Sequence, residues 1–159
     1  MQRRRLLILA GAALLFGMSG VRAAEQNNAG PDRAKLIGAW HMVSMEEQGQ
    51  DGRLEHHTDR TGMLVFTADG HFSVQVMYPE PDTAESANPT YAKDGYEATF
   101  GSYNVDEQTH TIRQHVQASL VRTLIGKDLP RLMQFSSDGY LTLRSARPEE
   151  KWSVTWEHD

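Results

Sequence analysis

The sequence of 159 residues contains no cysteine. This absence excludes disulfide bonds, catalysis by a thiol and any metal site that uses thiolate ligands. No covalent cross-link stabilises the fold, so its stability has to come from the burial of apolar side chains.

Basic residues are also scarce. The chain has 16 lysines and arginines against 21 aspartates and glutamates, so its formal net charge is −5. Four of the arginines lie in residues 1–23, which hold no acid, and their removal would take the net charge to −9. A protein this acidic is repelled by phosphate backbones and by anionic membrane surfaces, so neither nucleic acid nor a membrane is an expected partner.

Long hydrophobic runs are missing apart from Leu6–Phe16, which is too short to cross a bilayer comfortably. This run follows the basic residues Arg3–Arg5 and precedes Val21-Arg22-Ala23, where small residues stand at the positions that a signal peptidase reads. Residues 1–23 are therefore predicted to be a signal peptide. The mature protein is expected to be periplasmic or secreted, without stable membrane insertion. An uncleaved N-terminal anchor is the alternative, and the choice between general and twin-arginine export stays open.

The remaining 136 residues are enough for one domain. Residues 24–35 are predicted to be a polar tether that ends in a short helical turn, with Asp32 as its N-cap. Residues 36–159 form the predicted domain.

This domain is organised around the stretch Leu36–Met45, a run of apolar and β-favouring residues. Gly38 leaves room for a backbone or a large ring to approach closely, and Trp40 is expected to plug the closed end of a barrel. Seven further strands follow, mostly joined by short turns such as Ala68-Asp69-Gly70, and are predicted at residues 62–67, 72–78, 97–105, 109–120, 131–136, 140–144 and 151–157. No long helix and no βαβ spacing is present. The predicted fold class is all-β, an eight-stranded up-and-down antiparallel barrel.

Two connections are longer than the others. Residues Glu46–Asp59 are predicted to be an acidic, glycine-containing connection without a strand. Residues Pro79–Gly95 carry three prolines, and a loop of this length is usually functional or disordered. It is either a lid over the barrel mouth or a solvated insert, and the sequence favours neither.

The ordered set of landmarks resembles the bacterial and fungal lipocalin-like domain proteins. These landmarks are Leu36-Ile37-Gly38-x-Trp40, Gly62 with Asp69-Gly70, Gly101-x-Tyr103-x-Val105-Asp106, His115 with Ser119, Arg131, and Trp156-Glu157. The resemblance implies a small calycin-type barrel, and most members of the family lack an established activity. The family usually ends in Trp-x-Arg, whereas this chain has Trp156-Glu157-His158. The arginine that commonly packs across the first tryptophan of a lipocalin would then be Arg131 or be absent.

The predicted strand at 109–120 carries the most polar pattern. Strict alternation puts His115 and Ser119 on one face, and we expect this face to line the lumen. Arg131 opens the next strand and is expected to lie near His115, where the pair would suit a carboxylate or a carbonyl. A buried Arg131 needs an acceptor, which could be Glu97, a backbone carbonyl or a ligand. The alternative for His115 is a buried structural histidine satisfied by Ser119 and a neighbouring strand.

These patterns predict a carrier that binds a small hydrophobic or amphiphilic molecule, with one acidic or carbonyl end, in the barrel lumen. The candidate ligand-binding residues are His115, Arg131, Ser119, Tyr103 and Trp40. Two alternatives stay open: an isomerase- or cyclase-type enzyme with His115 or Tyr103 as the proton-transfer group, and a structural domain with a packed lumen. The sequence predicts no cofactor, and His56-His57 lacks a third ligand at a spacing typical of a metal site.

The predicted export can be measured directly. Protein isolated from its native host should have the mass of a chain that starts near Ala24, because signal peptidase would cleave after Ala23 and remove residues 1–23. Intact-mass spectrometry gives this value. A mature protein that retains residues 1–23 would contradict the signal-peptide prediction and favour the anchor.

Overall fold

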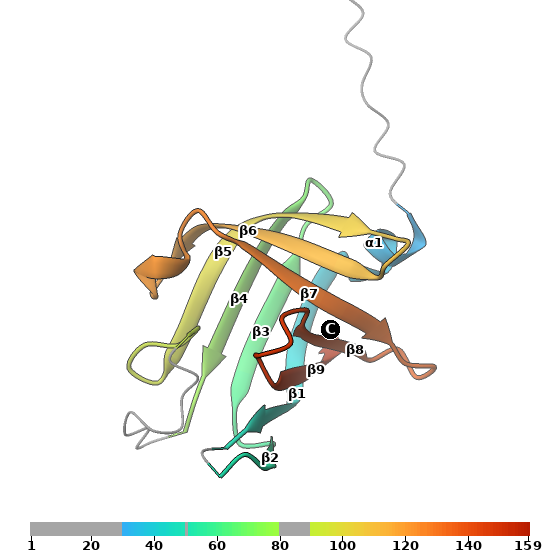
Figure 1. Cartoon of the computed structure of the whole chain (residues 1–159). Helices are drawn as coiled ribbons and strands as arrows, with labels where there is room; N and C mark the ends of the chain where they lie inside the picture. The colour runs from blue at the N-terminus through green and yellow to red at the C-terminus, as the bar shows by residue number, and fades with distance from the viewer. Residues whose placement is uncertain (1–29, 50, 80–89) are drawn as a thin grey trace, which may run out of the picture.

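A closed antiparallel barrel forms the body of the molecule (Figure 1). The structure is a computed structural model that describes residues 30–49, 51–79 and 90–159. The predicted signal peptide, residues 24–29 of the predicted tether and residues 80–89 of the long loop lie outside the described residues. The barrel strands are β1 (Gly38–Gln48), β3 (Thr61–Phe66), β4 (His71–Met77), β5 (Tyr96–Asp106), β6 (Thr111–Ser119), β7 (Asp128–Phe135), β8 (Leu141–Ser145) and β9 (Trp152–His158).

Each barrel strand pairs with the next barrel strand along the chain, and β1 also pairs with β9 to close the ring. The prediction of an eight-stranded up-and-down barrel is confirmed. Full closure pairs the first and last strands, so the barrel wall has no free edge where it closes. Within the described part of the chain, no helix has the length and apolar character needed to span a membrane.

A ninth strand, β2 (Leu54–His57), lies in the segment predicted to be a plain connection. It pairs antiparallel with the second half of β1, from Met45 opposite His57 to Gln48 opposite Leu54. Its side chains are exposed except for the partly buried His57. Because neither face of β2 is buried, its sequence does not alternate between apolar and polar residues. The strand forms because the end of β1 offers a backbone to pair with. Its sequence alone carried no signal for it.

The opposite end of the barrel is covered by the helix α1 (Pro31–Leu36) (Figure 1). The helix begins at Pro31 with Gly30 as its N-cap, so the prediction of Asp32 as N-cap is wrong. Proline suits the first helical position because its missing N–H would have no partner there. The backbone amides of Asp32 and Arg33 instead donate to the Glu107 carboxylate, each at 3.0 Å.

Trp40 occupies this closed end, as predicted. Its side chain is 2% exposed, and its indole Nε1 donates to the Leu36 carbonyl at the end of α1 over 2.9 Å. The His158 ring meets the Trp40 ring edge-on, with centroids 4.7 Å apart. Gly38 has φ +140°, and a Cβ at this position would overlap the His158 ring. His158 therefore packs on Trp40 where the family usually has arginine, and Arg131 does not take this role.

A β-bulge in β6 changes which side chains face inward. Val116 lies opposite Gly101 and Ala118 opposite Phe100, which leaves Gln117 without a partner. A bulge adds one residue to one strand and so shifts the alternation of its side chains. Strict alternation along this strand, which the sequence prediction assumed, is therefore wrong.

The bulge brings two backbones together at Gly101. A Cβ at Gly101 would overlap the backbone carbonyl oxygen of His115. We expect Gly101→Ala to lower the free energy of unfolding by about 3 kcal/mol or more, because backbone atoms cannot move aside as a side chain does. Urea unfolding followed by tryptophan fluorescence measures this change.

Gly139→Ala is the matched control. Gly139 has φ +89° and no atom within 4 Å of an added Cβ, so its substitution should cost only the left-handed backbone strain of about 1–2 kcal/mol. Equal losses in the two variants would show that β6 does not approach Gly101 as described.

Candidate functional site

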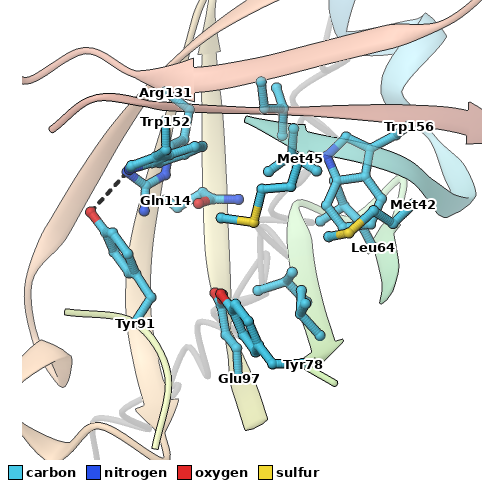
Figure 2. Close-up of a pocket in the computed structure, with 14 residues that line it drawn as sticks. Met42, Met45, Leu64, Tyr78, Tyr91, Glu97, Gln114, Arg131, Trp152 and Trp156 are labelled. Carbon is cyan, nitrogen blue, oxygen red and sulfur yellow. Dashed lines mark hydrogen bonds between the residues drawn. The ribbon is translucent and has the colours of Figure 1, made fainter. Parts of the chain in front are cut away.

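The half of the barrel away from α1 contains a cavity of about 60 Å³ (Figure 2). Its apolar wall includes two methionines of β1 and aliphatic side chains of four other strands: Met42, Met45, Leu64, Val76, Leu143 and Val154. Its polar lining comprises Glu97 on β5, Gln114 on β6, Arg131 on β7, and the phenols of Tyr78 and Tyr91. The lumen is therefore apolar over most of its wall and polar where these side chains meet.

Arg131 faces the lumen, as predicted, and its side chain is 6% exposed. Its Nη1 donates to the Tyr91 hydroxyl over 3.1 Å and lies 3.7 Å from Glu150 Oε2. Its guanidinium also stacks on the rings of Tyr91 and Trp152, at 4.7 Å from each centroid. The acceptors of this buried cation are thus supplied by the protein itself.

Glu150 is the anionic partner in this cluster. It accepts from the Tyr91 hydroxyl over 2.6 Å and from Arg147 Nη1 over 3.0 Å. Burial raises the pKa of this carboxyl, but hydrogen bonds from Ser145, Tyr91 and Arg147 and the charge of Arg131 outweigh burial and hold the pKa below its ordinary value. Glu150 is therefore ionised, and its negative charge is shared between Arg131 and Arg147.

Sequence reasoning missed Glu150 and Tyr91 as partners of Arg131. Both lie in connections, Tyr91 in the loop between β4 and β5 and Glu150 between β8 and β9. Neither position belongs to a periodic pattern. The one available signal was the requirement that a buried Arg131 find an acceptor, and that signal does not say which distant segment supplies it.

Glu97 is the other carboxyl of the lumen. It points inward from β5 because it shares the inner face of this strand with Thr99 and Tyr103. Its carboxyl makes no hydrogen bond within the described part of the chain. Burial raises the pKa of Glu97 from 4.5 to about 7, although the charge of Arg131 acts in the opposite direction.

Two further polar side chains line the cavity without a partner. Gln114 is 5% exposed, and its side-chain amide makes no hydrogen bond to any residue that the structure describes. Trp156 is 3% exposed, and its indole Nε1 has no acceptor among those residues. An unmet hydrogen bond at a buried polar group costs roughly 1–3 kcal/mol, so these groups favour an occupant that can bond to them.

The prediction that His115 faces the lumen is wrong. Its side chain is 51% exposed on the outer face of β6, where Nδ1 lies 2.8 Å from the Asp128 carboxylate. Because of the bulge at Gln117, His115 and Ser119 do not lie on the same face of β6. Ser119 lies opposite Thr99, with the two hydroxyl oxygens 2.9 Å apart, and does not line the cavity.

Tyr103 and Trp40 also lie outside the cavity, at the closed end of the barrel. The Tyr103 hydroxyl donates to the Thr67 carbonyl over 3.0 Å, and its ring meets the Phe66 ring edge-on. Of the five predicted ligand-binding residues, Arg131 alone lines the cavity. The other four do not contact this space.

A second buried ion pair supports the cavity from β1. Arg60 is 6% exposed, pairs with Glu47, and stacks over the Tyr78 ring at 4.7 Å. Its Nη1 also lies 3.0 Å from Met45 Sδ. This pair was not predicted, because Arg60 follows an irregular connection. It holds the end of β1 and the side chain of Met45 beside the lumen.

No metal centre accompanies these residues in the described ranges. His57 lies within 4.0 Å of carboxylates of Glu47, Glu55 and Asp59, yet no three such side chains of the described chain are arranged to hold an ion.

Eight strands closed in up-and-down order, with a cavity at one end, are the architecture of barrels that hold one small ligand. A model of the lipocalin-like domain family matches residues 37–158, so the chain belongs to this family. This assignment confirms the resemblance seen in the sequence.

Comparison with individual proteins adds little to the family assignment. No curated protein matches the chain. A redesigned β-barrel is 12% identical with a TM-score of 0.43, and the match covers 79% of this chain and 93% of the other. A DUF4847 family protein from Bacteroides vulgatus is 13% identical with a TM-score of 0.43, over 80% of this chain and 96% of the other.

The raised pKa of Glu97 makes stability depend on pH. A carboxyl with a higher pKa in the folded state stabilises folding only while it is protonated, so stability falls as the pH rises from 4.5 through about 7. We expect Glu97→Gln to match the wild type at about pH 4 and to exceed it by on the order of 3 kcal/mol at about pH 8. Urea unfolding at both pH values measures the difference.

Glu149→Gln is the control for this prediction, because Glu149 is exposed in the connection before β9. Its stability difference from the wild type should stay small at both pH values. If Glu97→Gln behaved in the same way, the Glu97 carboxyl would not be buried in the lumen.

Proposed function

We propose that this lipocalin-like protein is exported and binds a small, largely apolar molecule with one polar end in its barrel lumen. The observation that carries this proposal is a cavity with an apolar wall that is also lined by Gln114 and Trp156, whose polar side-chain groups have no hydrogen-bond partner among the described residues. A cavity with this lining is typical of a ligand site, since a few polar groups orient a molecule that apolar walls bury.

The size of the cavity limits the occupant. Its free volume of about 60 Å³ is smaller than the ~150 Å³ apolar cavity that holds a benzene molecule. Met42 and Met45 line this space, and methionine has flexible torsions that let it repack around an occupant. A ligand with a single ring or a short chain therefore fits once these two side chains move.

The enzyme alternative requires a different proton-transfer group from those predicted. His115 lies outside the barrel and the Tyr103 hydroxyl is bonded to a backbone carbonyl at the closed end. Glu97 is the lumenal group whose pKa of about 7 suits proton transfer. An isomerase or cyclase of this chain would lose turnover in Glu97→Gln while it still bound its substrate.

Cyclohexanone is a suitable first probe, because it combines an apolar ring with one carbonyl. With a dissociation constant near ~1 mM, ~10 mM probe should stabilise the protein by about 1.4 kcal/mol. A thermal melt should show this as a rise in Tm of a few degrees. Isothermal titration calorimetry gives the affinity independently.

Val76→Phe and Val43→Phe form a matched pair of variants for this experiment. Val76 lines the cavity, whereas Val43 is 39% exposed on the outer face of β1. Phenylalanine at position 76 should fill the lumen and abolish binding, and phenylalanine at position 43 should leave binding unchanged. No binding to the wild type, or equal binding to both variants, would refute a lumenal site.

A further inference from the structure

We propose that the lumen selects a ligand whose polar end is neutral, such as a ketone, an amide or an alcohol, over one that ends in a carboxylate. This inference rests on the proposed function and adds the chemical class of the ligand. It follows from which polar groups around the cavity already have partners and which do not.

The positive charge near the cavity already has an anionic neighbour. Among the described residues that line the cavity, Arg131 is the one cation, and it lies 3.7 Å from the Glu150 carboxylate and donates to the Tyr91 hydroxyl. Arg60, which lies beside the lumen, is paired with Glu47. A ligand carboxylate would therefore share Arg131 with Glu150 and would not gain a cation of its own.

Glu97 adds to the disadvantage of an anionic ligand. It lines the same cavity, and its carboxyl has no cation of its own, since Arg131 is paired with Glu150. A ligand carboxylate would share a buried site with the Glu97 carboxyl, and two carboxyl groups in one site disfavour each other's ionisation. Removing an anion from water without a partner is costly as well. A carboxylate ligand would pay both penalties, whereas a neutral ligand pays neither.

The groups without partners suit a neutral polar end. The Trp156 N–H is a donor, and the Gln114 amide is both a donor and an acceptor. A carbonyl oxygen can accept from either donor, and a hydroxyl or amide can also donate to Gln114 or Glu97. Figure 2 shows Gln114 and Glu97 directed toward the middle of the cavity from different strands, with Trp156 on the apolar side.

Cyclohexanecarboxamide and cyclohexanecarboxylate test this selectivity, because they share one shape and differ in charge. At about pH 7.5 we expect the carboxamide, like cyclohexanone, to bind at least about tenfold more tightly than the carboxylate. Isothermal titration calorimetry on the full mature chain gives all three affinities.

Two variants assign the contacts. Trp156→Phe removes the N–H and keeps an aromatic ring, and Gln114→Met removes the amide and keeps the length of the side chain. At least one should weaken the carboxamide by about fivefold and leave the carboxylate unchanged, because each removes a hydrogen bond that only the neutral ligand makes. Gln134→Met is the control, since Gln134 is exposed on the outside of β7. A thermal melt without ligand verifies that each variant is folded.

The outcomes separate this inference from the proposed function. Failure of cyclohexanone and the carboxamide to bind would refute the proposed function itself. Binding of cyclohexanone together with a carboxylate affinity equal to or above that of the carboxamide would overturn only the selectivity. An unchanged carboxamide affinity in both Trp156→Phe and Gln114→Met would overturn the assigned contacts.

Discussion

The pairing of β1 with β9 is the contact on which the rest of the structure depends. It runs from Trp40 opposite His158 to Glu47 opposite Trp152 and joins the two ends of the sheet. Without cross-links, a sheet of this size would otherwise expose two unpaired edges. Closure also creates the enclosed lumen, so the candidate site exists only because this seam forms. Gly38 belongs to the same seam, since its missing side chain makes room for the His158 ring against Trp40.

The two halves of the lumen differ in character because they are filled in different ways. At the end covered by α1, large aromatic side chains occupy the interior, and Trp40 and Tyr103 bond to backbone carbonyls. Toward the other end, methionines and aliphatic side chains leave a small space. Charged groups gather around this space, where loops rather than strands can supply their partners. The charged side chains that line the lumen, Arg131 and Glu97, therefore lie at the end away from α1.

The cluster of Arg131, Tyr91 and Glu150 joins three segments that are far apart in the chain. Glu150 places a negative charge beside Arg131, so a ligand anion at this end of the cavity would compete with a protein carboxylate for the same cation. The neighbouring polar groups without a hydrogen bond to the described part of the chain, on Gln114 and Trp156, are neutral. This division between satisfied charges and unsatisfied neutral groups defines what the lumen can recognise.

The sequence by itself determined the eight barrel strands, the role of Trp40 as a plug and the close approach at Gly38, because each depends on local pattern or on a residue without a side chain. It also indicated that Arg131 is buried. His115 points outward because Ile112 and Val116 occupy the inner face of β6, so the prediction put the wrong face of this strand in the lumen. Only the tertiary structure decided that Ser119 departs from the face of His115, since one unpaired residue at Gln117 shifts the alternation and leaves no mark in hydrophobicity. The strand β2 and the partners of Arg131 were likewise decided by tertiary contacts. They depend on which distant backbone or loop comes within reach once β1 closes on β9, and no local pattern carries that information.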